Sequence, residues 1–578
     1  MKLIFSYLSP YKGRMALGLL IKTTATLSEL LLPFILSHVL KNVVASADVT
    51  KIIMWGVLMI ACALVACFMH ITANRMAARV SRDFSIRMRR DLFSKTLRLG
   101  AENTDRLTVP SLEARITSDT YNVHNFISMM QRMGVRAPML LLGGITITLI
   151  MDSFLALVMI AMLPIIFCII YFISRKGVPL YTKVQKSVDR MVRVVREDAQ
   201  GIRVIKALSK NDYENRRYDE VNRTLSKDEA YAGTVMGIVN PVMTLLMNVG
   251  ITAVVALSAS RVANHSSDPE TVIAFMQYFT LISMAMMTLS RIFVMYTKCA
   301  ASARRISEVI NTPDPYFVTE PKANGKEHES NTEAAHIEFD SVSFSYLGKH
   351  NNLSDISFRL RRGESLGIIG ATGSGKSTLV KLLMRFYEPS EGRILIDGKE
   401  ITSYEKDALT AMFGSAMQND FLYADTIEEN IKFGREISHG DVERAARIAQ
   451  AEEFILNIAD GYSHMLSPKG TNLSGGQRQR LLISRALASK PEILILDDSS
   501  SALDYKTDAA LRRALRENLA DTTVITVAQR VSSVKDCDLI LVLEEGRVIG
   551  CGVHEELLHV CPEYKEISDS QMGGAFVE

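Results

Sequence analysis

Long, nearly uninterrupted apolar runs fill the first half of the chain. Residues 230–260 contain neither a charge nor a histidine, and they exceed the roughly 20 residues that a helix needs to cross a bilayer. Comparable runs occupy residues 15–40, 52–69, 137–151, 153–174 and 271–290. Buried helices of a soluble protein would explain one such run but not six in succession. We therefore predict six membrane spans, at roughly residues 15–40, 52–71, 133–151, 153–174, 232–260 and 271–295.

Basic residues are distributed unevenly between the predicted spans. Residues 72–136 and 175–227 are rich in Arg and Lys, whereas the connections at 41–51, around Asp152 and at 261–270 are short and poor in both. Because basic loops remain in the cytoplasm, we expect the N-terminus and the two basic segments there. These segments are too long for simple turns, so the spans should continue as cytoplasmic helices. The opening segment carries a proline and internal charges, which predicts an interfacial helix and not a cleavable signal peptide.

The pattern beyond residue 310 is that of a soluble domain. Residues 311–335 are polar and contain three prolines, which predicts a linker between a membrane domain at 1–310 and a second domain at 336–578. Residues 336–346 alternate between apolar and polar as a strand does, and residues 364–369 form a second predicted strand.

A glycine-rich segment, GATGSGKST, follows the second strand directly. It matches the pattern GxxxxGK[ST] in the strand, turn and helix context that this motif requires. Glycines let backbone N–H groups turn inward around phosphates, Lys376 would neutralise their charge, and Ser377 would supply a Mg²⁺ ligand. The predicted phosphate cradle consists of Gly370, Ala371, Thr372, Gly373, Ser374, Gly375, Lys376, Ser377 and Thr378.

Composition excludes several other classes of protein. Lys and Arg total 66 against 63 Asp and Glu, so the formal charge of +3 gives no signature of nucleic-acid binding. The seven cysteines are scattered without a CxxC pair, which argues against a disulfide scaffold and against a zinc module.

Three segments further along complete a recognisable set of motifs. They are LSGGQ at 473–477, the apolar run 492–496 that ends in Asp497, and SALD at 501–504. Together with the glycine-rich loop they resemble the signature, Walker B and D-loop of ATP-binding cassette (ABC) transporters, and an unrelated P-loop ATPase would lack LSGGQ. The order of spans, linker and cassette resembles an exporter half-transporter. The resemblance implies an all-α polytopic membrane domain with long cytoplasmic helices, followed by an α/β P-loop NTPase domain of the ABC ATPase type.

The resemblance also implies roles for individual residues, with ATP and Mg²⁺ as the bound species. Tyr346 matches the aromatic that stacks on adenine, although a strand aromatic is often only part of a core. Gln418 matches the Q-loop, so the implied metal ligands are Ser377, Gln418 and Asp497. The signature residues that would contact ATP in a dimer are Ser474, Gly475, Gly476 and Gln477.

Two positions depart from the pattern of an active ATPase of this family. Asp498 stands where the family normally has a glutamate that acts as general base, and Gln529 stands where it normally has a histidine. An amide cannot carry a positive charge or exchange a proton as imidazole does. We therefore expect these two catalytic positions to form an impaired site. The alternative is that Asp498 still serves as an adequate base.

In this family each ATP lies between the Walker A of one chain and the signature of the other. The intact LSGGQ and the altered site therefore belong to different ATP sites, and we expect a heterodimer with a second half-transporter in the cytoplasmic membrane of a bacterium. This resembles the degenerate subunit of heterodimeric bacterial multidrug exporters. A regulatory nucleotide-binding subunit and a homodimeric lipid or drug flippase with slow ATPase remain alternatives.

The sequence leaves the transported compound open between drug, lipid and peptide. Ionisable residues within or near the spans are candidates for the transport pathway. They are Lys22, Glu29, His38, Arg291 and Lys298. For those near the span ends, a side chain that reaches the membrane surface is the competing explanation.

Overall fold

The computed structural model describes residues 2–44, 48–263, 269–313, 335–346, 348, 350–418 and 420–572. Most of the predicted linker at 311–335 lies outside the described residues. The chain divides into two compact units. The first comprises Met1–Leu97 and Pro110–Asn311, and the second comprises Arg98–Val109 and Thr312–Glu578.

In the residues that the structure describes, the first unit is built of helices and short turns between them. Six helical segments in the described part of the chain are long and apolar enough to cross a membrane, which confirms the prediction of six spans. The helices are α1 (Lys2–Leu8), η1 (Ser9–Tyr11), α2 (Lys12–His38), η2 (Val39–Val43), α3 (Val49–Arg98), α5 (Val109–Ala114), η4 (Arg115–Asp119), α6 (Thr120–Met133), α7 (Arg136–Met151), α8 (Ser153–Ala207), α9 (Asn211–Gly237), α10 (Val239–Ala263) and α11 (Pro269–Ile310).

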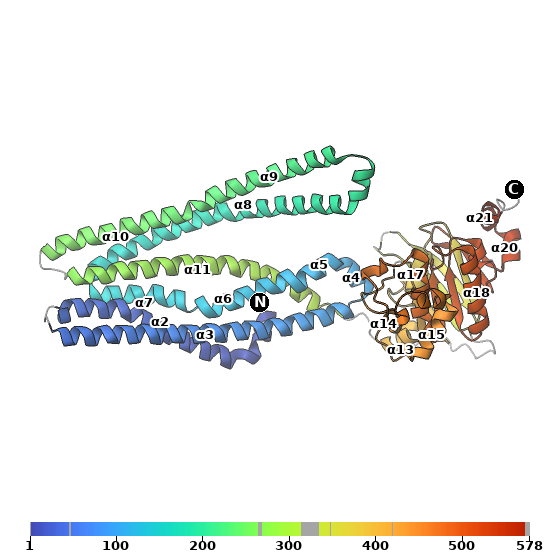
Figure 1. Cartoon of the computed structure of the whole chain (residues 1–578), viewed down its shortest axis with the longest axis horizontal. Helices are drawn as coiled ribbons and strands as arrows, with labels where there is room; N and C mark the ends of the chain where they lie inside the picture. Colours follow the sequence, from blue (N-terminus) through green and yellow to red (C-terminus); the bar gives the residue numbers. More distant parts are fainter. Residues whose placement is uncertain are drawn as a thin grey trace. The chain divides into compact units, whose positions relative to one another are not determined.

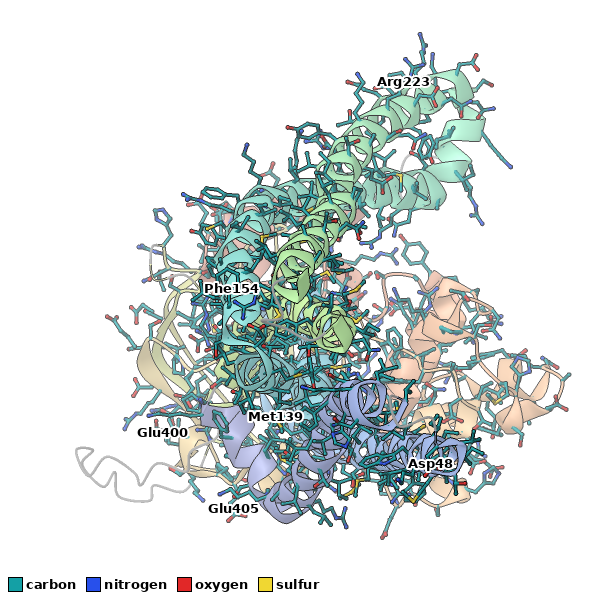
Figure 2. All side chains as sticks on the ribbon, turned by 90° about the vertical axis from the view of Figure 1, so that its left-hand side faces the viewer. Asp48, Met139, Phe154, Arg223, Glu400 and Glu405 are labelled. Atoms are coloured by element: carbon teal, nitrogen blue, oxygen red, sulfur yellow. The ribbon has the colours of Figure 1, made fainter. Side chains whose placement is uncertain are left out.

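Several of these helices are much longer than a bilayer is thick. The 50 residues of α3 correspond to about 75 Å of helix, against about 30 Å of hydrocarbon. Helices α8 and α9 run side by side (Figure 1), and the Lys183 ammonium lies 2.6 Å from a carboxylate oxygen of Asp228 between them. The short connections before α3 and α8, marked by Asp48 and Phe154, lie at the same end of this unit (Figure 2).

Helices α2, α7 and α11 enclose a buried apolar core. Leu30 of α2 packs there with Ala137 and Leu140 of α7 and with Tyr278 of α11. The Tyr278 hydroxyl donates to the Leu30 carbonyl at 2.6 Å, which satisfies the phenol inside an apolar environment. Large apolar side chains on the outer face of α3, such as Phe68, are exposed, as a lipid-facing surface requires.

The second unit contains two sheets. A six-stranded sheet has the order β10-β9-β3-β8-β7-β6, and only β10 pairs with its neighbour in antiparallel fashion. A smaller antiparallel sheet has the order β2-β1-β4-β5. The strands are β1 (Ile337–Phe344), β2 (Leu353–Leu360), β3 (Ser365–Gly370), β4 (Glu391–Ile396), β5 (Lys399–Glu400), β6 (Phe413–Ala416), β7 (Ile493–Asp497), β8 (Thr523–Val527), β9 (Leu539–Glu544) and β10 (Arg547–Gly552).

Short helices surround these sheets. They are α4 (Ala101–Leu107), α12 (Lys376–Leu383), η5 (Ile401–Ser403), α13 (Lys406–Met412), α14 (Ile427–Lys432), α15 (His439–Ile448), α16 (Glu452–Leu456), η6 (Gly461–Ser463), η7 (Pro468–Gly470), α17 (Gly475–Leu487), α18 (Tyr505–Asn518), α19 (Val531–Val534), α20 (His554–Val560) and α21 (Pro562–Met572). The expected α/β P-loop class is confirmed. Strands β3, β7 and β8 end at one edge of the sheet, where Asp497 pairs with Val527, and parallel α/β sheets bind ligands at such an edge.

Candidate functional site

The glycine-rich loop passes from β3 into α12 through backbone conformations that favour glycine. Gly373 has φ +88° and Gly375 has φ +101°. A Cβ atom on Gly375 would lie 2.6 Å from Leu353 Cδ2, so no larger residue fits without a shift. The first N–H groups of α12 therefore face the loop that the sequence predicts to bind phosphate.

Polar groups of this loop point into a cavity of about 310 Å³. The Lys376 ammonium donates to the carbonyls of Gly370 and Ala371, each at 2.8 Å, which holds it over the loop. Burial lowers the pKa of Lys376, and Asp497 and Asp498 oppose that shift. The buried Ser374 hydroxyl has no hydrogen-bond partner among the described residues. The glycine backbone, the Lys376 cation and the Ser377 and Thr378 hydroxyls that line this cavity fit a polyphosphate.

Two of the three predicted metal ligands lie side by side. The Ser377 hydroxyl donates to a carboxylate oxygen of Asp497 at 3.2 Å, at the end of β7. Asp497 is 2 % exposed, and burial raises the pKa of its carboxyl group, while the hydrogen bond from Ser377 lowers it. Mg²⁺ prefers a hard oxygen set of this kind, so the residues fit the metal that the motif implies.

The two altered residues, Asp498 and Gln529, are hydrogen-bonded to each other, and Gln418 joins them. The side-chain amides of Gln418 and Gln529 each donate to the same carboxylate oxygen of Asp498, at 3.3 Å. Burial raises the pKa of Asp498, whereas Gln418, Lys376 and Arg530 lower it. Asp498 has φ +50°, a left-handed conformation that aspartate tolerates better than most residues. Gln418 therefore lies beside the predicted base, and its neighbour Asn419 is outside the described residues.

Tyr346 lies beside the phosphate loop within a cluster of aromatic rings. Its hydroxyl is 3.2 Å from that of Thr378, and its ring meets Tyr387 edge to face, with centroids 5.0 Å apart. The Tyr387 hydroxyl in turn donates to Asp105 of α4, and burial, together with this hydrogen bond, raises the pKa of Tyr387. The turn formers around Asp105 indicate a cytoplasmic tip that contacts another part of the protein, but they do not identify Tyr387, which lies 282 positions away and belongs to no motif.

The signature segment forms the N-terminus of α17. Ser474 and Gln477 form a reciprocal cap, in which the Ser474 N–H donates to Gln477 at 2.9 Å and the Gln477 N–H donates to Ser474 at 3.3 Å. Ser474 and Gly475 are exposed, and Gly476 is half-buried beside Ala502. Within the described residues, none of the four signature residues lines the chain's own phosphate cavity. An exposed helix N-terminus of this kind is suited to an anion that comes from outside the chain.

Gln479 connects the signature helix to the D-loop, and sequence reasoning missed it. Its side-chain oxygen accepts from the Ala502 N–H at 3.0 Å, and its amide donates to the Ser501 hydroxyl at 3.3 Å. Gln479 lies two residues after the LSGGQ segment, and this closeness to a recognised motif is the only sequence feature that points to it.

The candidate pathway residues of the membrane unit have the following partners. Glu29 accepts from both ends of the Arg136 guanidinium, at 3.1 and 2.6 Å, and from His70 at 3.3 Å. Lys22 donates to the Asn74 side chain at 3.1 Å. His38 lies against the Trp55 ring, with centroids 5.1 Å apart, and the Arg291 and Lys298 side chains are exposed.

Comparisons with known proteins agree with this architecture. The family model "ABC transporter transmembrane region" matches residues 15–286, and the model "ABC transporter" matches residues 353–501. The chain is 34% identical to an uncharacterized ABC transporter ATP-binding protein of Bacillus subtilis strain 168, YfiB, over 99% of both chains. It is 30% identical to Rv1273c of Mycobacterium tuberculosis strain H37Rv, over 100% of this chain and 99% of that protein.

A solved structure shows the same fold. It is described as a bacterial Atm1-family ABC exporter with ATP bound, and it superimposes with a TM-score of 0.82 at 24% identity, covering 98% of each chain. Three observations therefore support one family assignment. They are the two family matches, the relatives that match along their whole length, and the cavity beside the phosphate loop. The chain belongs to the ABC transporter family: it joins an ABC transporter transmembrane region to an ATP-binding transport ATPase domain, and it has the fold of the Atm1-family exporter structure.

Proposed function

We propose that this chain is the degenerate-site subunit of a heterodimeric exporter in the cytoplasmic membrane of a bacterium, with its N-terminus and cassette in the cytoplasm. The observation that carries the proposal is the contact between Gln529 and Asp498 at 3.3 Å, which brings both departures from an active site together. The basic segments between the spans support the orientation. The exported compound is a drug, a lipid or a peptide.

The chemistry of hydrolysis explains why these two residues would impair the site. Aspartate is shorter than glutamate by one methylene, which withdraws the carboxylate by roughly 1.5 Å. Misplacement of about 1 Å near a reacting atom can cost on the order of a hundredfold in rate. The Gln529 amide also occupies a lone pair of Asp498, and it cannot stabilise developing negative charge as an imidazolium does.

The intact signature supports a role for this chain at the other ATP site. Ser474, Gly475 and Gly476 present a capped, exposed helix N-terminus to a nucleotide held by the Walker A of the second subunit. At this chain's own site, Ser377, Asp497 and Gln418 would hold Mg²⁺, which neutralises phosphate charge when bound. ATP at this site would keep the two cassettes in contact.

Reconstitution with and without a second half-transporter tests the proposal. The partner should carry glutamate and histidine at the two altered positions. We expect slow ATP hydrolysis by this chain alone, and fast hydrolysis with ATP-dependent dye uptake into inverted vesicles by the pair. Fast hydrolysis by the single chain would instead support a homodimer, and hydrolysis by the pair without uptake of any substrate would support a regulatory subunit.

We expect Lys376→Ala to weaken nucleotide retention at this chain's site and to reduce transport only partly. The equivalent substitution in the partner should cost on the order of a hundredfold, because there the lysine stabilises a reacting phosphate. Drug efflux by the two single variants, at matched expression, measures the asymmetry. Equal damage from the two substitutions would contradict the assignment of one degenerate and one competent site.

We expect Tyr387→Phe to reduce the amount of substrate transported per ATP hydrolysed, with ATP affinity unchanged. The substitution keeps the ring against Tyr346 but removes the hydrogen bond to Asp105, and so disconnects the predicted adenine contact from α4. Asp105→Asn retains an acceptor and serves as the matched control. A fall in ATP affinity equal to the fall in transport would show that Tyr387 only supports the pocket.

A further inference from the structure

We propose that the transported substrate is an amphiphile with an acidic head group. Its apolar body would lie between α2, α10 and α11, and its acidic group would face the cations of the membrane unit. The proposal rests on the export function proposed above and specifies the substrate class.

The described residues of the membrane unit line an open cavity of about 440 Å³ between α2, α10 and α11. Most of its lining is aliphatic and includes Leu32, Ile251 and Leu281, and its polar lining consists of Glu29, Gln277 and Thr280. A cavity of this size and character suits the apolar part of a small molecule, with a few polar groups that orient it.

The charges of the six predicted spans are unbalanced. Glu29 is the only acidic residue in them, whereas Lys22, Arg136 and Arg291 are basic. The carboxylate of Glu29 is already bound by both ends of the Arg136 guanidinium, an arrangement that satisfies both charges. A cationic substrate would therefore have to displace Arg136 in order to bind Glu29. The net charge that remains in the spans is positive.

Lys22 carries one of these uncompensated charges in the interior of the unit. It is 3 % exposed, and its ammonium donates to the neutral side chain of Asn74 at 3.1 Å. Charges at membrane depth are costly unless they are paired, and a buried ammonium cannot reach the membrane surface as an exposed one does. Lys22 precedes Glu29 by seven residues, two turns on the same face of α2, and thus lies about 10 Å along the helix from the cavity.

The second uncompensated charge continues a polar stripe from the cavity along α11. The stripe consists of Gln277, Thr280, Thr288, Arg291 and Lys298, whose intervals of 3, 8, 3 and 7 residues keep them near one face of the helix. The Arg291 and Lys298 side chains are exposed, and no acidic residue occurs between Thr271 and Ala303. A substrate with a carboxylate or phosphate head would meet cations along this face, whereas a cationic substrate would meet none of opposite charge.

Binding of matched probes tests the substrate class without relying on transport. The reconstituted pair is placed in nanodiscs of zwitterionic lipid and titrated with three fluorescent amphiphiles that share one apolar body and carry a carboxylate, a tertiary amine or a neutral amide. We expect the carboxylate to bind at least about tenfold more tightly, the effect of one charge-assisted hydrogen bond. Equal binding of the three probes, or tighter binding of the amine, would overturn the proposal.

Two variants locate the binding cations. Lys22→Gln and Arg291→Gln should each lower the affinity for the carboxylate probe about tenfold and leave the affinity for the amide probe unchanged. Arg291 is exposed, so its variant remains informative even if the Lys22 variant does not fold. Lys51→Gln, in the first turn of α3, is the matched control and should change neither affinity. Loss of affinity for the carboxylate and amide probes alike would contradict the proposal.

Two further measurements complete the test. The first distinguishes a transported substrate from a bound lipid, and the second distinguishes failure of the proposed substrate class from failure of the proposed export function. ATP-dependent uptake of the carboxylate probe into inverted vesicles is expected. Displacement of that probe by anionic phospholipid, with no uptake, would identify a lipid site and overturn the substrate assignment. Uptake of the amine probe alone would refute the acidic head group but not the exporter function. Selective binding without ATP-dependent uptake of any probe would refute the exporter function alone.

Discussion

Ser474→Arg or Gly475→Asp in this chain is expected to abolish most ATPase activity of the assembled pair, although the chain's own Walker A is unchanged. Both substitutions place a large or charged side chain at the exposed N-terminus of α17, where the γ-phosphate of the partner's nucleotide would be held. Removing such transition-state stabilisation costs on the order of a hundred- to a thousandfold in rate. Phosphate release by the purified pair measures the effect.

The control for this experiment is Gly475→Ala. Its Cβ atom would lie 3.5 Å from that of Ala502, an ordinary contact, so the helix and the D-loop should keep their positions. Ser474→Arg also loses the helix cap, which costs about 1 kcal/mol of stability, and melting of the pair must therefore be recorded alongside activity. Unchanged turnover in folded variants would refute the assignment of the signature to the competent site.

Motifs made of a few consecutive residues were predictable from the sequence. The glycine-rich loop, Asp497 and the signature carry their geometry in a few consecutive residues, because each sits where a strand ends or a helix begins. The six spans were equally accessible, since apolar length alone decides whether a helix can cross a bilayer. The strand β2 was missed, because its short pattern carries charges and lies between two stronger signals.

Contacts that join distant segments were not predictable. Glu29 accepts hydrogen bonds from Arg136, because α7 packs against α2 and presents its first residue there. A basic segment between spans gives no reason to single out Arg136. The contact of Tyr387 with Asp105 depends similarly on where α4 packs within the second unit. Tertiary packing decides such pairs, and one sequence does not encode it in any local pattern.

The double substitution Asp498→Glu with Gln529→His is expected to restore hydrolysis at this chain's own site by more than the two single substitutions combined. Asp498→Glu alone should help only modestly, because Gln529 would still contact the carboxylate and because glutamate tolerates the left-handed backbone of φ +50° less well than aspartate. Gln529→His alone would leave the base too short. Groups that act together in one transition state are not additive, so the double variant should exceed the sum.

This measurement requires the partner's site to be silent. Replacing the partner's catalytic glutamate with glutamine leaves phosphate release to report the site formed by Lys376, Asp497 and Asp498 of this chain. The wild-type background should then be slow and the double variant clearly faster, with nucleotide binding equal in both. A fast wild-type background would show that Asp498, despite its contacts with Gln418 and Gln529, is an adequate base. The main argument for a heterodimer would then fail, because two copies of this chain would form two working sites.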